Sequence, residues 1–122
     1  MMQVMVMLPT FNERQSVGSV IKSLLELEIQ SVQISIMVID DSSPDGTADY
    51  VRSLNLDNVE VLQRPSKDGL GTAYKAGIEK ALKESDVTHL VSMDADSSHR
   101  VADLSRLIES AKSNPAANLV IG

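Results

Sequence analysis

Apolar and polar residues follow two periods along the chain, and the two periods alternate. Short apolar runs indicate buried strands, whereas apolar residues three and four positions apart indicate helices that bury one face. The runs predict strands at Val4–Leu8, Ser35–Ile39, Val59–Leu62, His89–Met93 and Asn118–Ile121. The helical spacing predicts helices near Ser16–Leu27, Thr47–Leu54, Gly71–Glu84 and Val101–Ser113. This order predicts an α/β fold with a mostly parallel sheet flanked by helices.

The composition is that of one globular domain with an aliphatic core. The chain has 122 residues, of which 43% are hydrophobic, and its aromatic residues are Phe11, Tyr50 and Tyr74. We therefore expect a single domain over residues 1–122 with a core of Val, Ile, Leu and Met. A net charge of −6 argues against nucleic acid as a partner, because such binding needs a basic surface. The absence of cysteine excludes disulfides and thiolate chemistry.

The sequence also suggests where the protein is located and whether it self-associates. No stretch reaches the roughly 20 apolar residues of a membrane span, and Met1 begins a strand pattern rather than a signal peptide, so we expect a cytoplasmic protein. The last predicted strand is followed only by Gly122, which suggests a domain truncated before its sheet is complete. An unpaired sheet edge after Ile121 would favour a homo-oligomer.

Two acidic motifs follow predicted strands. Asp94-Ala95-Asp96 follows one strand, and Asp40-Asp41 follows an earlier one. If the first motif is extended, its two carboxylates point to the same side, about 6.6 Å apart, an arrangement that suits a divalent cation such as Mg²⁺ or Mn²⁺. Ligands of open α/β sheets bind at the carboxyl ends of strands, so both motifs are expected to line one crevice. With its cation, that crevice would receive a diphosphate.

Each acidic motif also has an explanation that needs no ligand. Asp96-Ser97-Ser98 could cap the following helix, and turn chemistry accounts for Pro44-Asp45-Gly46. Turn chemistry does not require Asp40 and Asp41. We expect one of these two carboxylates to accept hydrogen bonds from a ligand and the other to brace the loop.

Two further turns carry candidate binding residues. The turn Leu8–Glu13 lacks the glycine fingerprint of dinucleotide folds, but Phe11 offers an aromatic face for a base or sugar, and Glu13 offers a carboxylate. The alternative is that Asn12 caps the next helix, with Glu13 favoured near its N-terminus. The segment Gly69–Tyr74 has Tyr at the third glycine position and follows the third strand, so its glycines are expected to approach a ligand or begin a helix.

Four segments in this order resemble the inverting family-2 glycosyltransferases. They are residues 8–13, 38–47, 64–73 and 93–96, and the similarity runs along the whole chain. The nearest branch is the dolichyl-phosphate (polyprenol-phosphate) mannosyltransferases. The resemblance implies a GT-A fold, in which a Rossmann-like half binds a nucleotide sugar. Residues 1–122 would form that nucleotide-sugar-binding part, with the acceptor half missing.

The resemblance also implies roles for particular residues. Asp94 and Asp96 would be the catalytic pair, because together with Ala95 they hold the ribose and the metal-bound diphosphate. Asp96 would be the direct ligand of Mg²⁺ or Mn²⁺, with Asp94 and Ser98 completing the metal shell. The nucleoside would be flanked by Pro9, Phe11 and Glu13, and its base would contact Ile39 and Asp41.

The implied reaction is transfer of a hexose to a polyprenyl or dolichyl phosphate with inversion. The donor would be a nucleotide sugar, GDP-mannose or UDP-glucose, and the lipid acceptor implies peripheral contact with the membrane. A phosphate monoester has a second pKa of about 6 and is largely anionic at neutral pH, so it needs no strong general base.

Three alternatives stay open. The acceptor could be a soluble glycan or a protein, or the chain could be a non-catalytic nucleotide-binding or oligomerising remnant. A phospho-receiver signalling domain has a similar length and strand–helix alternation. That class needs an acidic pair after its first strand, where this chain has Leu8-Pro9-Thr10, and a Lys after its fifth strand.

Overall fold

Five parallel strands form one sheet in the computed structural model, which describes residues 2–65, 69–84, 86–95, 101–113 and 119–121. The order across the sheet is β3-β2-β1-β4-β5. The strands are β1 (Met2–Thr10), β2 (Val32–Asp40), β3 (Val59–Gln63), β4 (His89–Ser92) and β5 (Leu119–Ile121). The helices are α1 (Arg14–Leu25), α2 (Thr47–Ser53), α3 (Leu70–Glu84) and α4 (Val101–Ser113). The predicted α/β class and parallel sheet are confirmed.

The predicted elements are all present, and the differences lie at their ends. β1 and β2 are longer than their apolar runs, because backbone pairing continues from Met2 opposite Val32 to Thr10 opposite Asp40. Polar residues can belong to a strand when the neighbouring strand supplies hydrogen bonds. Hydrophobic periodicity does not detect this pairing. Met93 was predicted as the last residue of a strand but lies just beyond β4.

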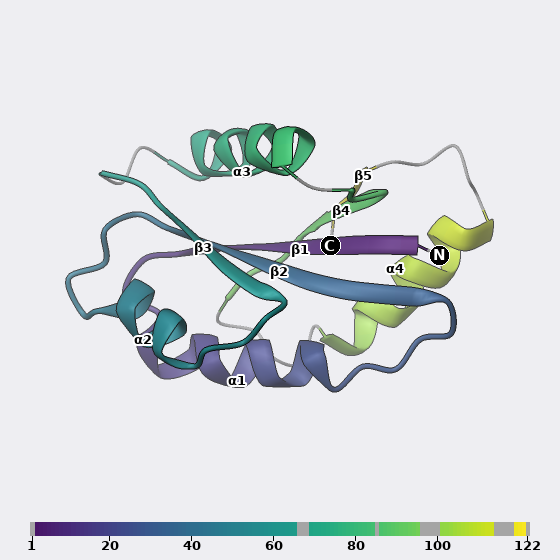
Figure 1. Cartoon of the computed structure of the whole chain (residues 1–122), viewed down its shortest axis with the longest axis horizontal. Helices are drawn as coiled ribbons and strands as arrows, with labels where there is room; N and C mark the ends of the chain where they lie inside the picture. The colour runs from purple at the N-terminus through teal and green to yellow at the C-terminus, as the bar shows by residue number, and fades with distance from the viewer. Residues whose placement is uncertain (1, 66–68, 85, 96–100, 114–118, 122) are drawn as a thin grey trace.

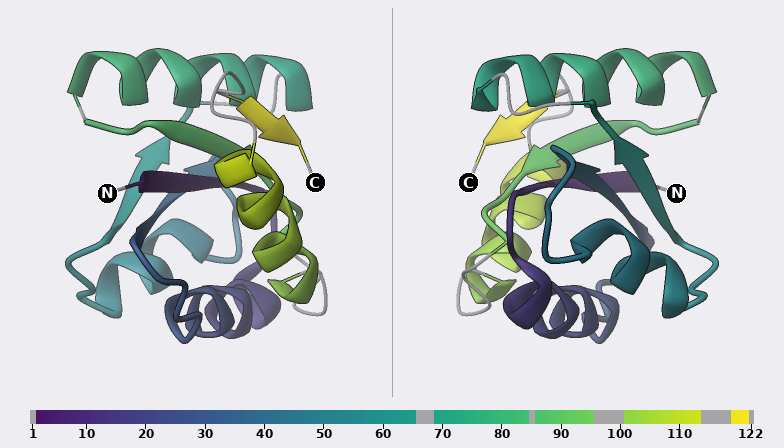
Figure 2. Two further views of the ribbon diagram at one scale, coloured as in Figure 1. Left: turned by 90° about the vertical axis from the view of Figure 1, so that its right-hand side faces the viewer. Right: turned by 90° about the vertical axis from the view of Figure 1, so that its left-hand side faces the viewer.

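Helices cover both faces of the sheet. Figure 1 shows α3 on one face and α1 and α2 on the other, and Figure 2 shows α4 on the same side as α1. β1 lies at the centre of the sheet and is covered on both sides, so the whole run Val4–Leu8 is buried and apolar. The apolar stripe of α1 is buried as predicted, at Val17, Val20, Ile21 and Leu24. Among the described residues, no helix has both the length and the apolar character that crossing a bilayer requires.

α3 packs against the sheet at Gly77. A Cβ atom at this position would lie 2.6 Å from Cδ1 of Ile39 and 3.3 Å from Sδ of Met7, and Ile39 and Met7 are almost fully buried. A larger residue at this position would therefore force buried side chains of β1 and β2, or the helix itself, to shift.

We expect Gly77→Val to lower the free energy of unfolding by about 1–3 kcal/mol, because the added side chain must displace α3 or its neighbours in the sheet. Urea unfolding followed by circular dichroism measures this change. Gly71→Ala in the same helix is the matched control, since a Cβ at Gly71 meets no atom within 4 Å. Equal stability of Gly77→Val and the control would contradict this account of the packing.

Candidate functional site

The loops that follow β1, β2, β3 and β4 leave the sheet at the same edge. Thr10 pairs in register with Asp40, and Asp40 with Gln63, so the residues after these three strands are neighbours. On the other side of β1, Ser92 at the end of β4 pairs with Met7. The strand order reverses between β1 and β4, and in open α/β sheets such a reversal marks the ligand crevice.

Asp40 braces the loop that follows β2. Its side chain is buried, and its Oδ1 accepts hydrogen bonds from Oγ1 of Thr10 at 2.6 Å and from Oγ of Ser43 at 2.6 Å. The backbone N–H of Ser43 donates to Oδ2 at 3.0 Å. The prediction that one carboxylate of the Asp40-Asp41 pair braces the loop is thereby confirmed.

Asp41 forms an ion pair with Arg64 at the end of β3. Oδ1 of Asp41 lies 3.3 Å from Nη1 of Arg64, and the two side chains are only 9% and 11% exposed, respectively. Nη2 of Arg64 also donates to Oγ1 of Thr72 in the first turn of α3, at 3.1 Å. The guanidinium therefore connects the end of β2 to the start of α3. Opposite charge and hydrogen bonding are what make a buried carboxylate tolerable.

Sequence reasoning assigned no role to Arg64. The signal lies in the register of β2 and β3, where Gln63 is opposite Asp40, so the next residues, Arg64 and Asp41, are adjacent. That register is not readable from the sequence, because the two strands are separated by α2.

Hydrogen bonds clamp the loop after β1 to the loop after β2. The backbone N–H of Asn12 donates to Oγ of Ser43 at 2.8 Å, and that of Glu13 donates to Oγ1 of Thr47 at 3.1 Å. Asn12 was considered as the cap of the first helix, but Glu13 occupies the N-cap position and no side-chain hydrogen bond caps the helix. Asn12 instead has a left-handed backbone, with φ of 57°. The two loops, residues 11–13 and 41–46, therefore form one continuous surface at the edge of the sheet, which we call the rim.

Asp45 does more than form a turn. Its carboxylate accepts hydrogen bonds from the backbone N–H groups of Arg14 and Thr47, at 3.2 and 3.0 Å, and from the hydroxyl of Thr47. Burial by itself would raise the pKa of Asp45, but these hydrogen bonds and the charge of Arg14 hold it below its ordinary value. An ionised Asp45 thus joins the starts of α1 and α2.

The residues predicted to flank a nucleoside lie on this rim. Pro9 is in β1, Phe11 is in the bend that follows, and Glu13 is the N-cap residue of α1; all three are partly exposed. Ile39 is different, because its side chain is fully buried beneath α3. A base at this edge would therefore meet the backbone of Ile39 and not its side chain.

The acidic triplet is described only in part. Asp94 is exposed, Ala95 is buried, and both follow the end of β4 at Ser92. The strand has ended before the triplet, and Ala95 lies in a turn. Asp96 and Ser98 lie outside the described residues. Within those residues, no three acidic or His side chains gather in a way that could hold a metal.

Like Arg64, Tyr74 was assigned no role by sequence reasoning. It lies near the acidic triplet. Burial raises the pKa of its phenol, the side chain of Ser92 lowers it, and the nearby carboxylate of Asp94 raises it further. Tyr74, in the first turns of α3, therefore lies close to the end of β4. The only hint in the sequence is that Tyr occupies the third position of a glycine-rich pattern.

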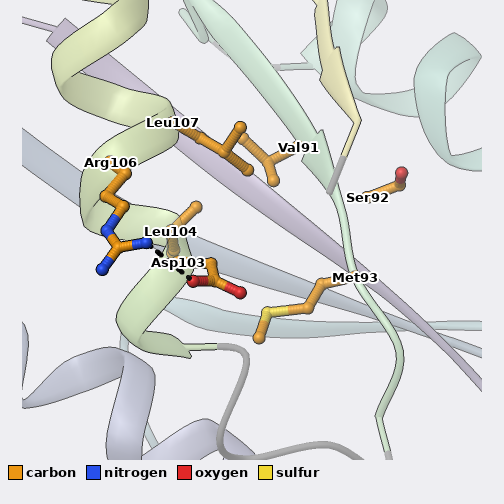
Figure 3. A pocket seen from close by; sticks show the side chains of 7 residues that line it. All are labelled: Val91, Ser92, Met93, Asp103, Leu104, Arg106 and Leu107. Atoms are coloured by element: carbon orange, nitrogen blue, oxygen red, sulfur yellow. Dashed lines mark ion pairs between the residues drawn. The ribbon is translucent and has the colours of Figure 1, made fainter.

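A cavity of about 290 Å³ lies between β4 and α4 (Figure 3). Its lining is mostly apolar, with Val91, Met93 and Leu104 on its walls and an Asp103–Arg106 ion pair at 3.9 Å. None of the described residues predicted to bind a nucleotide or metal lines it. The cavity is therefore separate from the rim at the ends of β1, β2 and β3.

The parallel sheet, the helices on both of its faces and the reversal of strand order define an α/β fold of the GT-A type. The chain belongs to glycosyl transferase family 2, whose family model matches residues 5–122. The fold is similar to that of a mannosyltransferase from Pyrobaculum calidifontis, solved in complex with GDP-Man and Mn²⁺. That structure has a TM-score of 0.60 and 24% identity, over 76% of this chain and 27% of the other.

Two curated relatives are closer in sequence. The chain is 42% identical to an undecaprenyl-phosphate mannosyltransferase of Micrococcus luteus, over 99% of this chain and 48% of the relative. It is 40% identical to a polyprenol monophosphomannose synthase of Mycolicibacterium smegmatis, over 97% of this chain and 43% of the relative. The chain therefore spans less than half the length of these two relatives.

Proposed function

We propose that this chain binds a nucleotide sugar at the carboxyl edge of its sheet. We further propose that the protein transfers the hexose, with inversion, to a polyprenyl phosphate at the membrane surface. The donor is GDP-mannose, with UDP-glucose as the alternative. The observation that carries this proposal is the meeting of the Phe11, Asp41 and Asp94 loops at one edge, in a family-2 chain whose curated relatives are named as polyprenol-phosphate mannosyltransferases.

The rim supplies the groups that a nucleoside needs. Phe11 offers an aromatic face for the base or ribose, Asp41 accepts a hydrogen bond from the base, and Pro9 and Glu13 flank the nucleoside. Asp40 fixes the loop that carries Asp41, because it holds Thr10 and Ser43 together. These contacts fix the loop that carries Asp41 before ligand binds, which reduces the entropy that binding must overcome.

Asp94, Asp96 and Ser98 would hold a divalent cation. Carboxylate and hydroxyl oxygens are hard donors, which suit Mg²⁺ or Mn²⁺, and the exposed carboxylate of Asp94 at the end of β4 fits this donor set. Such a cation supplies positive charge that stabilises the departing nucleoside diphosphate. With a net charge of −6, the chain itself would otherwise repel a diphosphate.

The proposed reaction requires no nucleophile from this chain. The lipid phosphate is already largely anionic at neutral pH, since its second pKa is about 6. Its oxygen would attack the anomeric carbon from the face opposite the nucleoside diphosphate, and the bond from that carbon to the diphosphate would break. The work of the rim residues is therefore to bind and orient the donor.

Calorimetric titration of GDP and of UDP into the chain, each with and without Mn²⁺, tests the proposal. We expect one nucleotide to bind, and to bind more tightly when Mn²⁺ is present. Absence of binding by both nucleotides would contradict a donor site in this chain. Mannose transfer from GDP-mannose to undecaprenyl phosphate, assayed in parallel, separates a working transferase from a nucleotide-binding remnant.

A further inference from the structure

We propose that Tyr74 is a positioning residue for Asp94, whose carboxylate it holds toward the divalent cation through a hydrogen bond from its phenol hydroxyl. This inference rests on the proposed donor site and adds to it a residue of α3. Tyr74 contacts neither the nucleotide nor the cation in this arrangement, so it acts only through Asp94.

Side chains around the end of β4 alternate between the two faces of the sheet. Three of them pack into the core cluster that α1 and α4 cover, namely Val91, Met93 and Ala95. Leu90 packs instead with residues of α3 on the other face. Figure 3 shows the side chain of Ser92 pointing away from Val91. Because successive side chains of an extended chain point to opposite faces, this alternation places Ser92 and Asp94 on the face that α3 covers.

Tyr74 reaches the same face from the first turns of α3. It is partly buried and packs against the cluster that contains Leu90 and Met7. Gly77, three residues further along, lies on the same side of the helix and brings α3 close to the sheet. A Cβ atom at Gly77 would lie only 2.6 Å from Cδ1 of Ile39. Packing therefore fixes the position of the Tyr74 ring relative to the end of β4.

The electrostatics of Tyr74 agree with this placement. Burial raises the pKa of its phenol, the side chain of Ser92 lowers it, and the charge of Asp94 raises it again. A charge affects a neighbouring group in this way only when the two lie near each other, since Coulomb interactions weaken with distance and screening. The phenol keeps its proton at neutral pH and is a hydrogen-bond donor, which the carboxylate of Asp94 can accept.

A carboxylate can accept this hydrogen bond and ligate a cation at the same time. Its two oxygens have about four lone pairs, so one oxygen can face the cation while the other accepts from Tyr74. Asp94 is exposed, and without such a contact its side chain would lose more conformational entropy when the cation binds. Groups that hydrogen-bond a ligating carboxylate fix its orientation, and their loss costs about 10–100-fold in metal affinity.

The test measures nucleotide binding by calorimetry at a series of Mn²⁺ concentrations, in the 122-residue chain and its Tyr74→Phe variant. The nucleotide is GDP or UDP, whichever binds the wild type more tightly. We expect the Mn²⁺ concentration at the midpoint of the gain in affinity to rise about tenfold in Tyr74→Phe. At saturating Mn²⁺ the affinity should return to within about twofold of the wild type, because mass action offsets a weaker metal site.

Tyr50→Phe is the matched control. Tyr50 lies in α2, on the face of the sheet opposite α3, and packs against α1 at Gly18. This variant loses the same hydroxyl far from Asp94 and should keep the wild-type midpoint. Both variants keep the aromatic ring, so we expect both to give the circular dichroism spectrum of the wild type.

The outcomes separate this inference from the proposed function. If the wild type binds neither nucleotide, the proposed function fails and takes this inference with it. If a nucleotide binds but Mn²⁺ has no effect, or Tyr74→Phe keeps the wild-type midpoint, the inference fails and the nucleotide site stands. The inference also fails if saturating Mn²⁺ does not restore binding, if Tyr50→Phe shifts the midpoint equally, or if Tyr74→Phe does not fold. Each of these three results would show that the hydroxyl does not act through Asp94.

Discussion

Replacing Asp96 with Ala is expected to abolish the Mn²⁺-dependent part of nucleotide binding. The proposal makes Asp96 the direct ligand of the cation that faces the diphosphate. Loss of groups that merely support a metal ligand costs about 10–100-fold in metal affinity, so removal of the ligand itself should cost at least about a hundredfold. Titration of the preferred nucleotide with increasing Mn²⁺ measures the effect.

The control for this prediction is Asp103→Ala. Asp103 lies on α4, its side chain is 62% exposed, and it pairs with Arg106 beside the separate cavity. This variant carries the same change of charge and should keep the wild-type dependence on Mn²⁺. An Asp96→Ala variant whose nucleotide affinity still rises normally with Mn²⁺ would remove Asp96 from the metal site.

Asp40→Ala is expected to cause the largest loss of stability at the rim. The buried carboxylate accepts three hydrogen bonds, from the Thr10 hydroxyl and from the N–H and hydroxyl of Ser43. A hydrogen bond to a charged group contributes about 1.5–3 kcal/mol, and such contributions are not fully additive, so we expect a loss of about 3 kcal/mol in the free energy of unfolding. Urea unfolding at neutral pH measures it.

The same variant should weaken nucleotide binding, because the loop that carries Asp41 loses its brace. Asp57→Ala serves as the control, since Asp57 is exposed in the turn before β3, away from the carboxyl edge. We expect its stability to lie within about 0.5 kcal/mol of the wild type. Asp40→Ala with the stability of this control would show that the hydrogen bonds of Asp40 contribute little to folding.

Much of the fold could be predicted because local patterns carry it. The buried stripe of α1 and the apolar run of β1 follow from spacings that the sequence displays directly. The ends of helices and strands were harder to predict. In β1, for example, the outer residues belong to the strand because they pair with β2. Hydrogen bonding between strands does not depend on whether a side chain is apolar.

The candidate site was likewise predicted in part from the sequence. The residue types at the ends of the strands predicted the edge where the loops meet and a bracing role for one residue of the Asp40-Asp41 pair. The hydrogen bonds identify that residue as Asp40. Residue types alone did not show that the side chain of Ile39 is buried or that Ala95 lies in a turn, because burial and local backbone depend on what packs above them.

The sequence by itself determined the α/β class, the parallel order of elements, the resemblance to family-2 glycosyltransferases and the acidic residues at strand ends. Only the tertiary structure decided that Arg64 pairs with Asp41, that Tyr74 meets Ser92 beside Asp94, and that α3 contacts the sheet through Gly77. The physical reason is the distance along the chain over which each kind of interaction acts. Periodicity and turn chemistry act between residues close in the chain, whereas these three contacts join elements that meet only when the sheet aligns its strands.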